Sequence, residues 1–166
     1  MTKLHIGCGT KRLAGFINID ESKNVKPDIV ASITKLPFKD GSVDEIYSAH
    51  TLEHIQDFRK AMREMHRVLK KGGKLVLVLP YPTSMATFVP HHYWYFSWDA
   101  LAPFVKGSGW AYYENFHFTS QKQQLIFGNW FYRLFAGFAN AHPALYQTTA
   151  FCHLIPAVEI KIEMIK

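Results

Sequence analysis

Two glycines and a carboxylate near the amino terminus form the most suggestive chemical pattern in this sequence. Gly7 and Gly9 flank Cys8 directly after the short apolar run 4–6, and Asp20 ends the next apolar run. Glycines let a backbone approach a ligand closely, and the N–H groups of such a turn can meet a carboxylate or phosphate. An aspartate at the end of the adjacent strand can accept hydrogen bonds from the two hydroxyls of a ribose. Together these residues favour a nucleoside-containing ligand over a purely structural turn.

The elements that must position these residues are the strands of a parallel sheet. Apolar runs predict strands over residues 4–6, 16–20, 28–33, 43–49 and 74–79. A helix is predicted over 57–70, because apolar residues recur there at helical spacing, Asp57 can cap its start and Gly72 can end it. Strands without polar alternation are typical of a parallel sheet covered on both faces. We therefore predict an α/β fold, a Rossmann-like three-layer sandwich with a mostly parallel sheet.

The connection between the first two predicted strands is unusually short. Only residues 10–15 separate them, whereas a parallel crossover normally takes a dozen or more residues and contains a helix. We therefore expect the first crossover helix to be missing. The glycine turn then has no helix N-terminus behind it, which leaves one side of the site for a partner subunit or the carboxy-terminal half to cover.

After Pro80 the sequence becomes aromatic and irregular, and residues 91–98 fit neither a strand nor a helix. The elements predicted beyond them are a short helix from Ser97 or Asp99 to Val105, a strand over 110–118, a helix over 125–139 and a half-exposed strand over 157–165.

Length and composition fit a single domain over residues 1–166. The chain has 48% hydrophobic residues and a net charge of +6, which favours anionic partners. The basic residues are scattered rather than clustered, so nucleic acid is a less favoured acceptor. Cys8 and Cys152 have no metal-type spacing, and the sequence shows no signal segment and no apolar run of about 18 residues. We expect a cytoplasmic protein with no membrane span, and a homo-oligomer is compatible with the sequence.

Several motifs resemble the class I SAM-dependent methyltransferases in both order and spacing. They are L-H-I-G-C-G, F-I-N-I-D, L-P-F-K-D-G-S-V-D-E-I, H-T-L-E-H-I and R-V-L-K-K-G-G-K-L. The last two are much more specific than a glycine turn, and the resemblance runs from Leu4 to about Pro80. It implies a cofactor-binding half over 1–80 and a variable acceptor-binding half over 81–166.

The resemblance also implies S-adenosylmethionine (SAM) as cofactor and a set of residues that bind it. Gly7, Cys8 and Gly9 would lie against its methionine part, Asp20 would hold the ribose, Ser32 and Ile33 would border the adenine, and Ser48 to Leu52, with His50 among them, would line the methyl-transfer side. Two positions depart from the family. His5 stands where an acidic residue is usual, and Ser32 where aspartate is common, so modest affinity for SAM is expected.

Methyl transfer from a sulfonium is an in-line SN2 displacement, which depends above all on positioning. A hydroxyl or amine acceptor also benefits from a general base, and histidine suits neutral pH. The candidates for this base are His50, His91 and His92. The acceptor itself is not identified, with a small molecule or a sugar or lipid intermediate favoured. Glu53 and His54 are interpreted as structural.

Three other functions compete with this one. His50, Glu53 and His54 fit H-x-x-E-H, the pattern of a zinc hydrolase, although the segment follows a strand and precedes the predicted helix. A nicotinamide-binding domain would need a third glycine where Arg12 stands. The more serious alternative is a non-catalytic binding or assembly module on the same fold.

Overall fold

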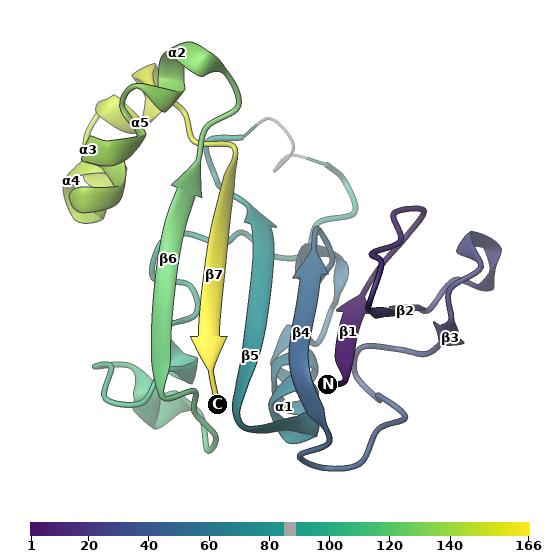
Figure 1. Ribbon diagram of the computed structural model, residues 1–166. Helices are drawn as coiled ribbons and strands as arrows, with labels where there is room; N and C mark the ends of the chain where they lie inside the picture. Colours follow the sequence, from purple (N-terminus) through teal and green to yellow (C-terminus); the bar gives the residue numbers. More distant parts are fainter. Residues whose placement is uncertain (85–88) are drawn as a thin grey trace.

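A single seven-stranded sheet runs through the molecule in the computed structural model, which describes residues 1–84 and 89–166 (Figure 1). Its strands are β1 (Lys3–Ile6), β2 (Ile17–Asp20), β3 (Ile29–Val30), β4 (Val43–Ala49), β5 (Leu69–Pro80), β6 (Ser120–Ile126) and β7 (Glu159–Ile165). They lie in the order β3-β2-β1-β4-β5-β7-β6. All neighbours are parallel except the pairs β5–β7 and β7–β6. The predicted Rossmann-like fold with a mostly parallel sheet is confirmed.

The first crossover has no helix, as the sequence predicted. Residues 7–16, all of them described, connect β1 to β2 through turns alone, and the next connection contains only the 3-10 turn Lys23–Val25. The loop is held to the sheet by the buried side chain of Asn18, which accepts a hydrogen bond from Leu13 N (2.8 Å) and donates to Phe16 O (3.1 Å). Polar contacts therefore replace the packing that a helix would supply.

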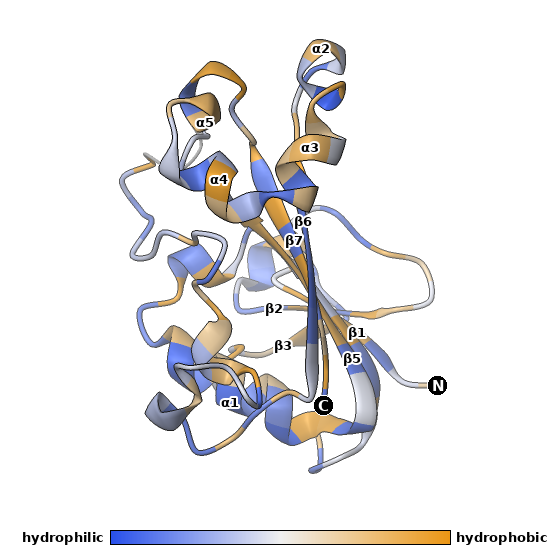
Figure 2. Ribbon diagram, turned by 90° about the vertical axis from the view of Figure 1, so that its left-hand side faces the viewer, coloured by the Kyte–Doolittle hydropathy of each residue, from blue (hydrophilic) through white to orange (hydrophobic). Residues whose placement is uncertain are grey.

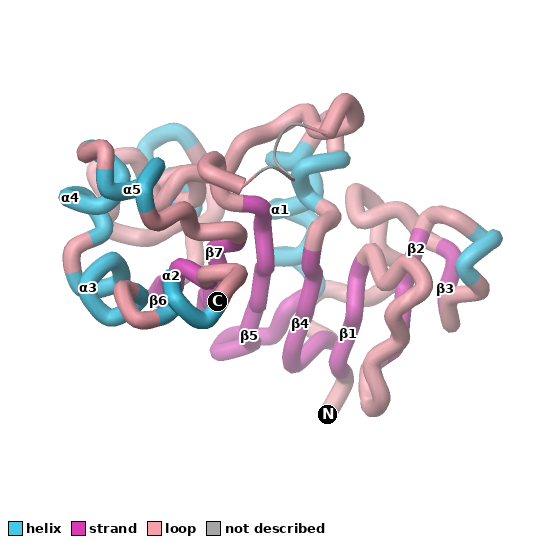
Figure 3. Tube along the Cα trace, turned by 90° about the horizontal axis from the view of Figure 1, so that it is seen from above, coloured by secondary structure: helices cyan, strands magenta, loops and turns pink. Residues whose placement is uncertain are grey.

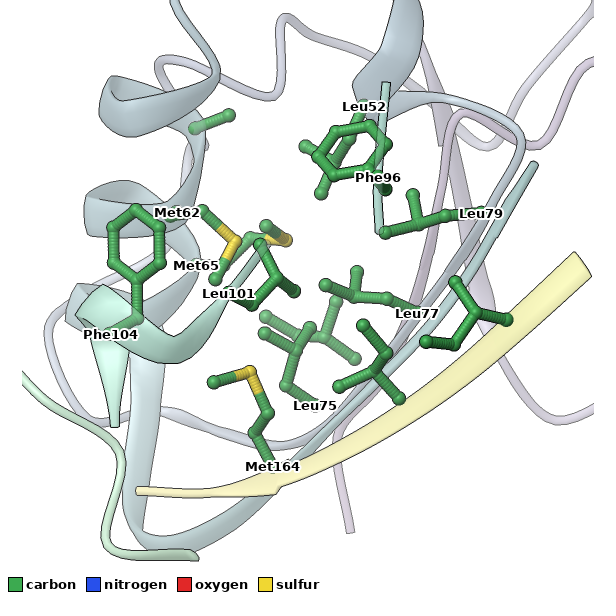
Figure 4. Packing of buried hydrophobic residues seen from close by; sticks show 14 of the residues in the cluster. Leu52, Met62, Met65, Leu75, Leu77, Leu79, Phe96, Leu101, Phe104 and Met164 are labelled. Carbon is green, nitrogen blue, oxygen red and sulfur yellow. The ribbon is translucent and has the colours of Figure 1, made fainter. Parts of the chain in front are cut away.

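One face of the sheet is covered by α1 (Phe58–Val68), which forms where the sequence predicted a helix. Asp57 caps it by accepting a hydrogen bond from Lys60 N (3.0 Å). The buried side of α1 packs on aliphatic side chains of β5, and residues from the aromatic second half complete this core (Figure 4). The labelled core residues are Leu52, Met62, Met65, Leu75, Leu77, Leu79, Phe96, Leu101, Phe104 and Met164.

Arg67 connects the motif R-V-L-K-K-G-G-K-L with the motif L-P-F-K-D-G-S-V-D-E-I through hydrogen bonds. Its guanidinium group donates to Phe38 O (2.9 Å) and Leu36 O (3.2 Å), while the Glu64 carboxylate accepts from both Arg67 and Leu36 N. The segment after β3 is thereby fixed against the end of α1.

The opposite face is largely open. In the described part of the chain, helices lie over the α1 face or beyond the β6 edge, and the open face is crossed only by the loop 7–16 (Figure 2). Its central strands carry charged pairs instead of a continuous apolar surface: Lys3 with Glu45 (2.7 Å), and Lys74 with Glu163 (3.1 Å). The third layer of the predicted sandwich is thus a short loop rather than a set of helices.

The second half differs from the prediction in several elements. The predicted strand over 110–118 is wrong: these residues form the 3-10 turn Ala111–Tyr113 and further turns, because Gly107 and Gly109 begin a tight loop. The predicted helix over 125–139 is wrong at its start, since residues 120–126 form β6. The helices that follow are α2 (Trp130–Arg133), α3 (Ala136–Ala141), α4 (Pro143–Thr148) and α5 (Phe151–Leu154).

Two predicted helices are also shorter than expected. The α1 helix ends at Val68, and Gly72, at a φ of 78°, lies in an irregular stretch of β5 where its N–H donates to Lys166 O (2.8 Å). The helix expected to end at Val105 is only the 3-10 turn Ala102–Phe104. The half-exposed final strand is confirmed as β7. Among the described residues, no helix has the length and apolar character needed to cross a membrane.

Candidate functional site

The strand order of the sheet reverses between β1 and β4 (Figure 3). Two clefts open at the carboxyl ends of these two strands. In open α/β sheets this reversal is where ligands bind, because the connections diverge on either side. The first cleft, of about 310 Å³, is lined by Ile6, Gly7, Gly9, Asp20, Glu21, Ala31, Ile33, His50, Thr51, His54 and Ile55. The second, of about 420 Å³, shares Gly7, Gly9 and His50 with the first. Both volumes fall in the range of small-molecule sites.

The glycine turn separates the two clefts, and its two glycines are needed for different reasons. Gly7 has a φ of 68°, and a Cβ there would lie 2.1 Å from Thr51 Oγ1. The backbone of β1 can therefore pass the end of β4 only with glycine at this position. Gly9 has a φ of 49°, but no described atom lies within 4 Å of where its Cβ would be. Its surroundings are open, as expected for a residue that faces a ligand.

Asp20 lines the first cleft directly beside the turn. Its Oδ2 accepts a hydrogen bond from Gly9 N (2.9 Å), and its Oδ1 accepts one from Ser22 N (2.9 Å). A carboxylate has about four acceptor sites, so each oxygen keeps capacity for a ligand hydroxyl. The adjacent Glu21 also lines the cleft. It was not predicted, although its position directly after Asp20 was a usable signal.

An apolar wall completes the first cleft. Ile33, which was predicted, lines it together with Ala31 and Ile55, which were not. Ser32 does not line it; its hydroxyl pairs with Thr34 Oγ1 at 3.1 Å. The wall is therefore suited to a flat apolar group rather than to a hydrogen-bonded one.

Two other predicted residues lie outside the first cleft. Cys8 is 4% exposed and lines the second cleft, and burial, followed by the nearby Asp20, raises the pKa of its thiol. Ser48 is 1% exposed and lines neither cleft. It shares the α1 face of β4 with Ile46, since alternate residues of a strand face the same way.

His50 borders both clefts and lies between two carboxylates. Its Nδ1 is 3.4 Å from the buried Glu53 Oε1, and its Nε2 is 2.9 Å from Glu159 Oε1. The neighbouring Glu53 carboxylate raises the pKa of His50 against the opposing effect of burial, and Glu159 adds to the rise. The backbone has a φ of 50°, which a non-glycine residue adopts only where the surroundings impose it. Glu159 was not predicted, because it comes from β7, more than a hundred residues along the chain.

His91 and His92 line neither cleft. The carbonyl of His91 accepts a hydrogen bond from His54 Nδ1 (3.2 Å), and the ring of His92 packs edge-on against that of His54, with 4.6 Å between centroids. His54 itself lines the first cleft. The H-x-x-E-H pattern does not form the helix-borne pair that a zinc hydrolase of this type uses, since Glu53 and His54 lie on the 3-10 turn Leu52–His54 and His50 precedes it.

Comparison with known proteins gives a family for the first half of the chain. Residues 4–77 match a family described as a methyltransferase domain. The chain is 40% identical over 63 residues to demethylmenaquinone methyltransferase of Corynebacterium efficiens, covering 38% of this chain and 27% of that protein. It is 39% identical over 49 residues to sterol 4-C-methyltransferase strm-1 of Caenorhabditis elegans, covering 30% and 15%. The chain therefore spans about a quarter or less of the length of these two relatives.

Two solved structures share the fold over the whole chain. A SAM dependent methyltransferase from Archaeoglobus fulgidus matches with a TM-score of 0.68 and 14% identity, covering 99% of this chain and 86% of that one. A SAM-dependent methyltransferase from Thermotoga maritima, titled a possible histamine N-methyltransferase, matches with a TM-score of 0.64 and 19% identity, covering 99% and 82%. The match over residues 4–77 and this shared fold agree with the resemblance found in the sequence to the class I SAM-dependent methyltransferases.

Proposed function

We propose that the first cleft binds SAM and that the protein transfers the methyl group of SAM to a small-molecule acceptor. The observation that supports this most directly is the placement of the Gly7–Gly9 turn and the Asp20 carboxylate on one cleft at the reversal of strand order. SAM supplies a methyl group made electrophilic by its sulfonium. The chain has to bind SAM, orient it toward the acceptor and take up a proton where the acceptor carries one.

The residues of the first cleft suit the parts of SAM one by one. The remaining acceptor sites of Asp20 are available to the two ribose hydroxyls. Ile33 and Ala31 offer an apolar surface to the adenine. The open backbone at Gly9 allows close approach of the methionine part. Cys8 and Ser32 would contribute through their backbone, and Ser48 through its support of β4.

His50 is the best placed of the three candidate bases. It borders both clefts, whereas His91 and His92 line neither. Two neighbouring carboxylates stabilise its protonated form, which makes the imidazole a stronger proton acceptor. We assign His50 the uptake of the acceptor's proton during methyl transfer.

The acceptor is assigned to the second half, residues 81–166, within what we propose to be a single domain. The curated relatives are named for demethylmenaquinone and a sterol, which supports a small apolar acceptor here. The scattered basic residues give no comparable support for nucleic acid. A cytoplasmic location and the oligomeric state stay predictions.

Isothermal titration of SAM and S-adenosylhomocysteine into the purified protein tests the cofactor assignment. Asp20→Ala should weaken binding about 5- to 150-fold, the effect of about 1–3 kcal/mol from lost buried hydrogen bonds. Asp99→Ala, which changes an exposed aspartate outside both clefts, is the matched control and should bind as the unaltered protein does. Thermal unfolding of both variants checks that Asp20→Ala still folds.

Three other outcomes would change the proposal. Failure of the unaltered protein to bind either compound would overturn it in favour of a non-catalytic module. Tight binding of SAM with no transfer to any of a panel of small acceptors would keep the cofactor and reject the enzyme. Turnover that His50→Ala leaves unchanged would keep the enzyme and reject His50 as its base.

A further inference from the structure

The aromatic segment of the second half is attached to the turn that follows β4. Tyr93 N donates to Glu53 O (2.7 Å), and the indole N–H of Trp94 donates to Ile55 O (2.8 Å). These bonds join segments that are about forty residues apart in the chain. They place His92 directly beside His54.

The side chains brought together there form a set of metal-ligand type. One carboxylate oxygen of Glu53 and one ring nitrogen each of His54 and His92 lie within 4.8 Å of one another. Zinc bonds of about 2.0–2.1 Å at tetrahedral angles hold ligand atoms about 3.3 Å apart. Rotations that move these atoms by about 1 Å would therefore complete the coordination.

Glu53 is an unusual residue to bury without such a role. Its side chain is 1% exposed, and among the described residues neither carboxylate oxygen accepts a hydrogen bond. Its Oε1 lies 3.4 Å from Nδ1 of His50, an ion-pair distance without a hydrogen bond. A buried carboxylate without hydrogen bonds is costly, and a bound cation would offset that cost.

His54 is already oriented as metal-binding histidines usually are. Its Nδ1 lies 3.2 Å from the carbonyl oxygen of His91, which can only accept, so Nδ1 carries the hydrogen. In the neutral ring this leaves the lone pair on Nε2. A hydrogen bond from the other ring nitrogen to a backbone carbonyl is the arrangement that fixes such ligands.

We propose that Glu53, His54 and His92 bind a Zn²⁺ ion. Three protein ligands of this kind leave one coordination position open. Because His54 also lines the first cleft, the ion would lie beside the site proposed for methyl transfer. Resting on the function proposed above, the ion would bind an oxygen, nitrogen or sulfur atom of the acceptor and hold it near His50. This ligand set differs from the H-x-x-E-H pattern, since His92 takes the place of His50.

The test is titration of Zn²⁺ alone into tag-free protein that has been stripped with a chelator and dialysed. One equivalent should bind, and Co²⁺ should give the visible absorption of a four-coordinate site. His92→Ala and His54→Ala should each weaken Zn²⁺ binding at least about tenfold. Loss of a group that only supports a metal ligand already has an effect of about this size, so loss of a ligand should have at least as large an effect. His153→Ala, an exposed histidine elsewhere, is the matched control and should bind normally.

A buried amide in Glu53→Gln can impair folding, so the two histidine variants decide the test. Absence of stoichiometric Zn²⁺ binding, or binding that His92→Ala leaves unchanged, overturns the proposal. Loss of binding in His50→Ala but not in His92→Ala would instead support the H-x-x-E-H set. The Zn²⁺ titration contains no SAM, so a negative result there says nothing against SAM binding. SAM binding is tested separately by the titration with Asp20→Ala.

Discussion

The two faces of the sheet are built by opposite means. On the α1 face, β5 presents Leu75, Leu77 and Leu79, each at most 1% exposed and packed in the main core. On the open face, Val76 and Val78 alternate with them, and neither belongs to that core. The same face carries the charged pairs Lys3–Glu45 and Lys74–Glu163.

The difference shows how the fold tolerates the loss of its first crossover helix. A helix that disappears from an apolar face leaves exposed hydrophobic surface, which favours association. Here His5 and Asn18 are buried polar residues joined at 3.1 Å, and burial lowers the pKa of His5, so the ring packs as a neutral group. The sheet that positions the site thus has one apolar face, covered by α1, and one more polar face, which needs no covering helix.

The largest effect should come from the α1 face. Leu77→Ala removes a fully buried side chain and should cost about 2–5 kcal/mol of unfolding free energy, because the surrounding core cannot collapse completely into the space. Val78→Ala, the next residue on the open face, should cost less, about 1–2 kcal/mol for two methyl groups. Urea unfolding measures both, and equal losses would show that the open face is packed as tightly as the other.

A smaller loss is expected where polar contacts replace the helix. Asn18→Ala removes the acceptor of Leu13 N and the hydrogen bonds to Phe16 O and the Asp28 carboxylate. Leaving such buried groups unpaired should cost about 1–3 kcal/mol. Asn24→Ala, in an exposed turn, is the control and should stay within about 0.5 kcal/mol in the same urea experiment. An Asn18 variant as stable as the control would mean that the loop needs no anchor.

The first half could be predicted closely because buried parallel strands appear in a sequence as apolar runs. The strand over 43–49 has the predicted bounds, and Asp57 caps the predicted helix. The strand β6 was missed because its sequence, S-Q-K-Q-Q-L-I, is polar: its residues face solvent at a sheet edge. There α3 covers part of the strand through Asn140, whose side chain bonds Leu125 N and O.

The residues of the candidate site likewise divide into those that the sequence predicted and those that it did not. Gly7, Asp20 and His50 were predictable because each follows a strand, and the carboxyl ends of parallel strands meet at one edge. Glu159 lies beside His50 only through the pairing of β7 with β5. His92 lies beside His54 only because residues 93–94 are attached to the turn after β4. Such contacts leave no local pattern in the sequence.

The smallest effect should come from the charges of the open face. Glu163 lies 2.8 Å from Lys161 and 3.1 Å from Lys74, and the hydrogen bond from Lys161, with that from Lys74, lowers the pKa of Glu163 to about 2. A carboxyl group with a lowered folded-state pKa stabilises the protein above its unfolded pKa of about 4.3, and this contribution is lost as the pH falls toward 2. Both lysines are more than a third exposed, so solvent screening limits the contribution to about 0.2–1 kcal/mol. Glu163→Gln should therefore lose this amount in urea unfolding at pH 7, and the difference from the unaltered protein should shrink at pH 3 and in about 1 M salt. A loss above 2 kcal/mol, unchanged by pH or salt, would show that charge pairs hold the open face as firmly as the core holds the other.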